Sequence, residues 1–453
     1  MLVARSTLSA IRATRDLRLV CHALIALFCL LTGSGIASEN TPAAPVEVVS
    51  WVRAHARPFE TVEAGRGFVD LEPLRAMIGT ARIVALGEPT HGSREVFQLK
   101  HRVVEFLVTE LGFTAFAIEA NMPEARHVDD YVSRSQGDPA DLIRGMRFWT
   151  WSTEEVRALV ENLHEFNFDP ANQHAGRHVE FAGFDMQDSR VASTFVHDYV
   201  AAHDAQFLAT VDAAIAALKP GSRDSFGFTT GTSAGRALEL WHGIEVRLAK
   251  SASRIPASAE AVAATWATQY AHIVVQSLAL DATPLVFRDE SMARNVEWLL
   301  AQNPHAKIVL WAHNEHVKRE PEAMGGYLSQ RFGGDLVVVG FATGHGAYRA
   351  RGQRGDHALG SFPLQMPPAG SVESVFAATR LPLFMVDLRS TPTDAAARWL
   401  LDDHPLRSIG AMELTGEFQF RPASVARNYD LMFWIEQTSP TVPLPGGWPP
   451  MKK

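Results

Sequence analysis

The chain has 453 residues, of which 47% are hydrophobic, so it can bury a large core and belongs to neither the fibrous nor the disordered class. Its formal charge is −8 and it contains no basic run, which argues against a nucleic-acid partner.

The N-terminus has the pattern of an export signal. Four arginines within the first 18 residues precede the apolar run "LVCHALIALFCLL" and the small-residue stretch "TGSGIAS". This order predicts a signal peptide at residues 1–37, cleaved near Ala37, and a periplasmic or secreted protein. The alternative is an uncleaved membrane anchor, but the apolar run is short for a span of about 20 residues.

Cleavage would change the composition of the mature chain. It removes four Arg and one Asp, so the formal charge becomes −11, and it removes both cysteines, Cys21 and Cys29. The mature protein is therefore expected to have no disulfide, no thiol nucleophile and no Cys-ligated zinc. No second apolar segment is long enough to span a bilayer, so we expect no membrane span after cleavage.

Strand and helix patterns alternate along most of the chain. A helix is predicted over residues 92–110 and several over about 123–168. Continuous apolar runs predict strands at 82–88, 113–120, 179–186, 306–313, 336–344, 381–389 and 429–437. This alternation predicts an α/β fold with a mostly parallel central sheet flanked by helices.

Residues 190–282 differ from this pattern, because they form long Ala-rich amphipathic segments with no strand signal between them. We interpret them as a helical subdomain inserted into one catalytic α/β domain of residues 38–453. The insertion and the loops near 220–235 and 345–365 are the expected determinants of substrate choice.

Polar residues cluster where the predicted strands end. In an open α/β sheet the ligand site lies beyond the carboxyl ends of the strands. In chain order, the strand-end groups are Glu88 and His91, Glu119, Asp185 and Gln187, and His313, Asn314, Glu315 and His316. A carboxylate at the end of a buried run needs a partner, and we expect these strand-end acids and imidazoles to pair with one another.

Glu88 and His91 suggest a specific chemistry. Glu88 can accept a hydrogen bond from one ring nitrogen of His91, which leaves the other nitrogen as a base toward water. Thr90 can cap the helix that follows, so free N–H groups would point toward this site. Simpler interpretations remain: Glu88 could pair with an arginine, and His91 could merely begin a helix.

Other enzyme classes fit less well. "GTSAG" (231–235) has the spelling of a nucleophile elbow but follows no strand, and no glycine-rich phosphate loop follows the first strand. A divalent metal is a remaining alternative, since the same five carboxylates and imidazoles, Glu88, His91, Glu119, His313 and His316, could ligate one. A non-catalytic ligand-binding protein is another, and His313 and His316 could also be satisfied core histidines.

Six segments carry a resemblance to a known family. They are "LGEPTHGSREVFQLKHR" (86–102), "FTAFAIEA" (113–120), "MRFWTW" (146–151), "FAGFDMQ" (181–187), "FRDESMARNVEWL" (287–299) and "VLWAHNEHV" (309–317). In type and order they resemble the erythromycin esterase family. The resemblance implies hydrolysis of an ester or macrolactone, such as a macrolide antibiotic, by activated water, with neither a metal or other cofactor nor an acyl-enzyme serine.

The resemblance also implies roles for individual residues. His91 would be the general base, Glu88 and Glu119 would position it or the water, and His313 and His316 would complete the site. The implied partner is a small-molecule ester or lactone, and no pattern predicts an oligomeric state.

Four further residues are candidates for substrate binding or oxyanion stabilisation. Lys100 stands at a basic position that is Arg in some family members, and Arg288 is the second cationic candidate. Arg288 could instead bridge to an acid such as Asp289 or Glu290. Trp149 and Trp151, with Phe148, could form an apolar wall for a large ring, or they could be core residues.

Overall fold

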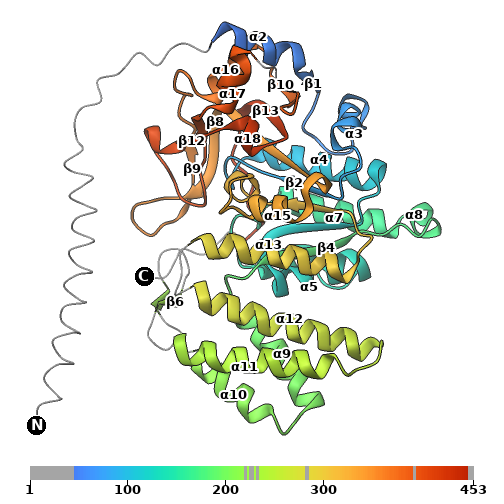
Figure 1. Ribbon diagram of the computed structural model, residues 1–453. Helices are drawn as coiled ribbons and strands as arrows, with labels where there is room; N and C mark the ends of the chain where they lie inside the picture. Colours follow the sequence, from blue (N-terminus) through green and yellow to red (C-terminus); the bar gives the residue numbers. More distant parts are fainter. Residues whose placement is uncertain are drawn as a thin grey trace, which may run out of the picture. The chain divides into compact units, whose positions relative to one another are not determined.

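A nine-stranded, mostly parallel sheet forms the centre of the fold, as the sequence predicted (Figure 1). Its order is β1 (Arg57–Pro58), β10 (Leu383–Asp387), β13 (Leu431–Thr438), β8 (Leu336–Arg351), β2 (Ile83–Leu86), β7 (Ile308–Trp311), β3 (Ala115–Asn121) and β4 (Glu180–Asp185). All pairs from β13 to β4 are parallel. β1 and β10 form an antiparallel edge, and β9 (Leu359–Pro363) pairs antiparallel with β8.

This computed structural model describes residues 45–218, 222–223, 229–230, 234–280, 285–390 and 394–446. The predicted signal peptide, residues 1–37, and most of the 220–235 loop lie outside the described residues. None of the described helices is both long and apolar enough to cross a bilayer.

The central strands β2 and β7 are apolar throughout because both faces of the sheet are covered. In β2, Ile83 and Ala85 face one hydrophobic cluster, whereas Val84 and Leu86 face the other, and all four are fully buried. A buried parallel strand has no solvent side, so its sequence is a continuous apolar run rather than an alternating one.

Helices from different parts of the chain cover the two faces (Figure 1). One face is covered by α3 (Pro73–Ile78), α4 (Arg94–Leu111), α5 (Met122–Arg134), α6 (Pro139–Gly145) and α7 (Glu154–Phe168). The other is covered by α2 (Val46–His55), α13 (Leu285–Gln302), α15 (Met324–Phe332), α16 (Val372–Ala378) and α17 (Ala395–Leu401). Shorter elements are α8 (Pro170–His174), α14 (Asn314–Val317), α18 (Val425–Asn428) and the hairpin β11 (His404–Arg407) with β12 (Phe420–Ala423).

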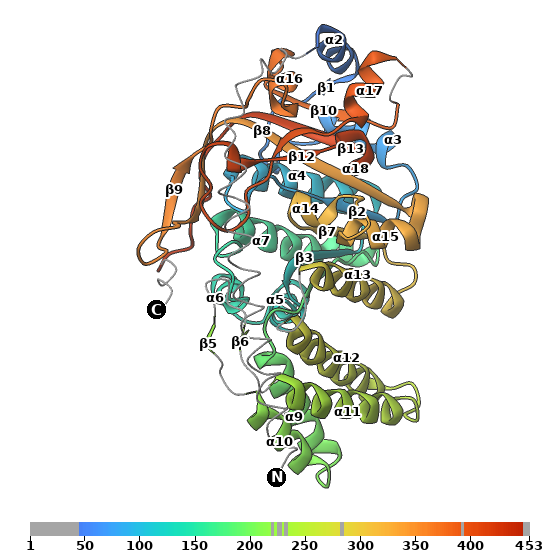
Figure 2. The same cartoon turned by 60° about the vertical axis from the view of Figure 1, so that its left-hand side comes forward.

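The stretch predicted as a helical insertion contains a separate layer of helices (Figure 2). They are α9 (Arg190–His203), α10 (Leu208–Ala217), α11 (Ala234–Ala252) and α12 (Ala259–Leu280). α12 packs against α9 and α11, and α13 contacts both α12 and β4. The prediction that residues 190–282 are helical without strands was wrong in one detail, because β5 (Ser222–Arg223) and β6 (Thr229–Thr230) form a short antiparallel ribbon.

Candidate active site

Four neighbouring strands bring the predicted site residues to one edge of the sheet. β2, β7, β3 and β4 are adjacent and parallel, so their carboxyl ends meet. Glu119 lies in β3 beside a register irregularity, and Asp185 is the last residue of β4. Glu88 follows β2, and His313 follows β7.

Glu88 lies between the imidazole of His91 and the ammonium group of Lys100. Its Oε1 is 2.7 Å from His91 Nδ1, as the sequence predicted, and its Oε2 is 2.6 Å from Lys100 Nζ. Glu88 and Lys100 are fully buried, so Lys100 lies behind Glu88 rather than facing a substrate. Burial lowers the pKa of Lys100 to about 8, although the Glu88 carboxylate opposes that shift. The expectation that Lys100 binds substrate or an oxyanion stays a prediction, while the contact that the structure shows is the one with Glu88.

The turn between β2 and α4 fixes the backbone around His91. The helix begins at Arg94, two residues later than predicted, and Ser93 is its N-cap residue. Thr90 Oγ1 accepts the Gly92 N–H at 3.3 Å, so it stabilises the turn rather than the helix itself. A Cβ atom at position 92 would overlap the Arg349 carbonyl of β8, which explains the glycine.

Arg288 joins the second group of acids. Its guanidinium donates to Asp185 through Nε at 3.2 Å and Nη2 at 2.7 Å, and to Glu119 Oε1 through Nη2 at 2.7 Å. Arg288 is thus a bridge, but to these two acids and not to its sequence neighbours Asp289 and Glu290. Burial alone would raise the pKa of Glu119, but His316 and Arg288 hold it well below its usual range.

His316 belongs to a second carboxylate–imidazole pair. Its Nδ1 is 2.8 Å from Asp289 Oδ1, and its Nε2 is 3.3 Å from Glu119 Oε1 and 2.9 Å from Arg288 Nη1. Burial alone would lower the pKa of His316, but the carboxylates of Asp289 and Glu119 raise it to about 10.

Two features of His316 favour different protonation states. The short approach of Arg288 Nη1 is a hydrogen bond only if Nε2 carries no proton, because a guanidinium only donates. The charge balance favours the protonated ring, since three carboxylates, Glu119, Asp185 and Asp289, surround a single guanidinium. We assign the protonated ring, with Nε2–H donating to Glu119, because an uncompensated excess of buried negative charge costs more than one lost hydrogen bond.

His313 lies beside His91 but has no free ring nitrogen. The two ring centroids are 5.1 Å apart. Nε2–H of His313 donates to the Ile409 carbonyl at 3.1 Å, and Nδ1 accepts the Glu315 N–H at 3.2 Å. Burial and the neighbouring His91 lower the pKa of His313 to about 4, so the ring is neutral at physiological pH. This geometry fits a residue that caps α14 and packs against His91 better than an acid or base.

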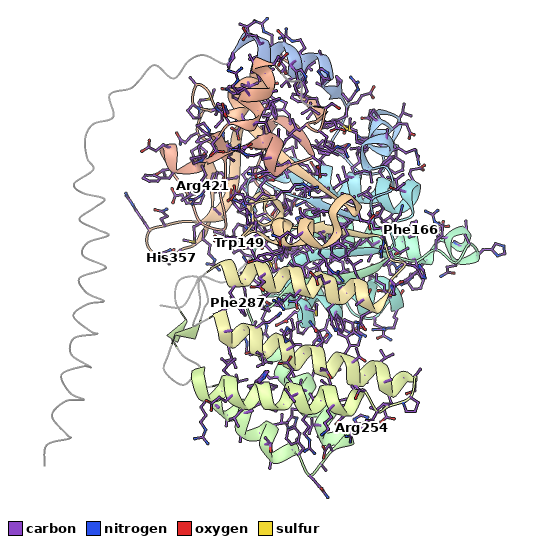
Figure 3. All side chains as sticks on the ribbon, in the orientation of Figure 1. Trp149, Phe166, Arg254, Phe287, His357 and Arg421 are labelled. Atoms are coloured by element: carbon purple, nitrogen blue, oxygen red, sulfur yellow. The ribbon has the colours of Figure 1, made fainter. Side chains whose placement is uncertain are left out.

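The predicted aromatic wall is largely packing. Trp151 is 1% exposed, its Nε1–H donates to the Glu119 carbonyl at 2.9 Å, and its ring meets the His91 ring edge-on at 5.6 Å. Trp149 is also buried, and Figure 3 labels its position. Trp151 is thus packed as a core residue, the second of the two interpretations of the sequence, and it supports the site from within.

Exposure separates the site into two layers. Glu88, Lys100 and Asp185 side chains are 0% exposed, whereas His91, Arg288 and His316 keep 11%, 10% and 16%. An incoming molecule would thus meet His91, Arg288 and His316, with the Glu88 and Asp185 carboxylates beneath them. Among the described residues, no group of three His, Cys, Asp or Glu side chains is arranged to hold a metal ion.

Two acids in this site were not assigned a role from the sequence. Asp185 was noted only as a strand end, and Asp289 only as a possible partner of Arg288. Asp185 does carry the strand-end signal, but nothing in the sequence pairs Asp289 with His316.

Two cavities of about 540 and 610 Å³ lie elsewhere, one lined by α12 and α13 and the other by α5, β4 and α12.

Comparison with known proteins agrees with the resemblance noted in the sequence. A family model described as Erythromycin esterase matches residues 108–438. Its range includes Glu119, Arg288, His313 and His316, whereas Glu88 and His91 precede it. Erythromycin esterase type II of Escherichia coli is 26% identical over 431 residues, covering 86% of this chain and 97% of that protein.

Solved structures share the fold. A Bacillus cereus protein has a TM-score of 0.77 and 26% identity, covering 87% of this chain and 98% of its own. A mutant of the erythromycin esterase EreC in its open conformation has a TM-score of 0.66 and 17% identity, covering 85% and 98%. The second likeness shows the fold alone.

The assignment of His316 predicts a pH dependence of stability. A pKa raised from 6.5 to about 10 adds stability that is fully present below pH 6.5 and is lost as the pH rises through about 10. The free energy of unfolding in urea should therefore fall between pH 6.5 and 10 in the unaltered protein, and fall less in His316→Gln. Identical pH profiles for the two proteins would mean that the ring is neutral and accepts from Arg288.

Proposed function

Because the chain belongs to the erythromycin esterase family, we propose that it hydrolyses a carboxylic ester or a macrolactone, with His91 activating the attacking water. One observation carries this proposal. His91 Nδ1 is held by Glu88 at 2.7 Å, while Nε2 has no hydrogen-bond partner in the part of the chain that the structure describes, and the ring is partly exposed. A neutral imidazole bound through Nδ1–H presents a lone pair on Nε2, which is the atom that can take a proton.

The reaction then follows in two steps. His91 Nε2 accepts a proton from water as the oxygen attacks the ester carbonyl carbon, which forms a tetrahedral oxyanion. The carbon–oxygen bond to the alcohol breaks, and the imidazolium returns its proton to the departing oxygen, which gives an acid and an alcohol. Glu88 stabilises the imidazolium between these steps, as a carboxylate partner does in other acid–base sites.

Arg288 and His316 are the groups that could stabilise the oxyanion. Both keep exposed surface in the site. Arg288 Nη1 cannot donate to a protonated His316 ring 2.9 Å away, so it can donate to the oxyanion, and the positive charge of His316 adds to the attraction. Asp185, Glu119 and Asp289 fix the orientation of these groups before substrate arrives. Lys100 would act indirectly, by holding Glu88.

The substrate class comes from the relatives. The Escherichia coli relative is named an erythromycin esterase, so macrolide lactones are the first candidates, with simple esters and other lactones as the comparison. We propose no metal or other cofactor, because the acids and imidazoles are already paired with one another.

Replacing His91 tests the proposal. His91→Asn should lower kcat by about 10²–10⁴-fold, because general base catalysis contributes an effect of that size. The assay is hydrolysis of macrolides and p-nitrophenyl esters, with products identified by mass spectrometry and the fold checked by circular dichroism. His203→Asn, on the exposed end of α9, is the matched control and should keep full activity.

Three outcomes would contradict this proposal. Wild-type turnover by His91→Asn would remove the general base. Activity that is lost on dialysis against a chelator and restored by a divalent ion would favour the metal-dependent alternative. Thermal stabilisation by a ligand without product formation would favour a binding protein.

We also propose that the chain is exported, as its first 37 residues predict. The intact mass of the protein recovered from the periplasm or the medium should then correspond to a chain that begins close to Ser38. A mass that retains Met1, or recovery only from inside the cell, would argue against export.

A further inference from the structure

A segment beyond the family-model match runs along both loops of the site. Residues 439–446, here called the C-terminal strap, follow β13, and the match to the family model ends at residue 438. Two isolated bridges show its course: Pro440 pairs antiparallel with Ser93, and Pro443 pairs antiparallel with Thr153. Ser93 lies two residues after His91, and Thr153 lies two residues after Trp151.

The first half of the strap binds the start of α4. The Ser439 carbonyl accepts the Arg94 N–H at 2.9 Å, and the Thr441 N–H donates to the Gly92 carbonyl at 3.0 Å. The Glu95 carboxylate accepts the Ser439 N–H and hydroxyl, each at 2.6 Å. This half therefore holds the backbone on the carboxyl side of His91 at Gly92 and Arg94, and it binds the side chain of Glu95.

The second half binds the start of α7 in the same way. The Val442 carbonyl accepts the Glu154 N–H at 2.8 Å, and the Leu444 N–H donates to the Ser152 carbonyl at 3.0 Å. The Val442 N–H lies 3.2 Å from both oxygens of Glu155.

This double contact has a simple physical origin. The first N–H groups of a helix have no partner within the helix and need an acceptor from outside. Arg94 and Glu154 are the first residues of their helices, and the strap supplies one carbonyl to each. One extended segment thus caps two helices, each of which begins three residues after a site residue.

The contacts of the strap continue into the site. The Gly92 carbonyl also accepts the Arg349 N–H at 3.0 Å, and Arg349 Nε donates to the Thr441 carbonyl at 2.7 Å, so strap and β8 meet next to His91. On the other loop, Trp151 touches the His91 ring and donates to the Glu119 carbonyl. A shift of either loop would change the position of His91 relative to Glu119.

We propose that the C-terminal strap is a positioning element of the hydrolytic site, which holds the His91 loop and the Trp151 loop at a fixed separation. The proposal rests on the proposed function, because the effect expected is on the activation of water by His91. The strap acts through the two loops and is not itself a catalytic group.

Truncation at the C-terminus tests this proposal. A chain that ends at Thr438 lacks the strap, and a chain that ends at Gly446 keeps it and is the matched control. We expect the shorter chain to lose about 10²-fold in kcat, since displacing a reacting group by about 1 Å can cost that much, with KM changed much less. The control should keep wild-type kcat.

A point variant keeps the test decisive if the shorter chain does not fold. Glu95→Ala removes the carboxylate that binds Ser439 of the strap and also Thr438 at the end of β13. Glu110→Ala removes an exposed carboxylate from the same helix, where it pairs with Arg75. We expect Glu95→Ala to lower kcat by about tenfold and to shift the pH profile of kcat/KM, with Glu110→Ala unchanged. Glu95→Gln keeps one acceptor oxygen and should recover part of the loss.

The outcomes separate this proposal from the proposed function. If the unaltered chain hydrolyses no ester or lactone, the proposed function fails and the role of the strap fails with it. If the unaltered chain is active and Glu95→Ala keeps its kcat and pH profile, the strap is not a positioning element, while the proposed function stands. A kcat loss that disappears once every variant is assayed fully folded would also overturn the proposal, because it would reflect stability alone.

Discussion

The burial of the Glu88 carboxylate is the constraint on which the rest of the site depends. A carboxylate taken out of water costs several kcal/mol unless partners compensate it. Here each oxygen has one partner, His91 Nδ1 at 2.7 Å and Lys100 Nζ at 2.6 Å, and Lys100 also lies over the Trp311 ring at 4.1 Å. Because Glu88 needs both partners, it holds the His91 ring in one orientation, and the Lys100 ammonium group is buried beside it.

Similar carboxylate pairs lie beside the neighbouring strands. Asp289 holds His316 through Nδ1, as Glu88 holds His91, and Arg288 neutralises Asp185 and Glu119 together. The acids from the strand ends thus form a buried layer, and the groups that they orient form the accessible layer above. Such a site is arranged before substrate binds, which is what electrostatic stabilisation of a transition state requires.

Much of this arrangement could be predicted from the sequence. The apolar runs that end in Glu88, Glu119 and Asp185 predict both the strands and the edge where they meet, because parallel strands share one carboxyl edge. The partners of Arg288 could not be predicted, since they depend on where α13 crosses that edge, about 100 residues after Asp185. The burial of Trp151 likewise depends on tertiary packing, and the strap has no periodicity because it is extended and rich in proline.

The tautomer of His91 decides whether this ring can act as the general base. A base at Nε2 requires the neutral ring to carry its proton on Nδ1, bound to Glu88, with Nε2 unprotonated. Nitrogen-15 NMR of histidine-labelled protein, with His91→Asn used to assign the signal, distinguishes the two tautomers without any substrate. We predict a protonated Nδ1 and a bare Nε2 at pH values where the ring is neutral. A neutral His91 ring with its proton on Nε2 would exclude His91 as the base, because that nitrogen could not then accept a proton from water.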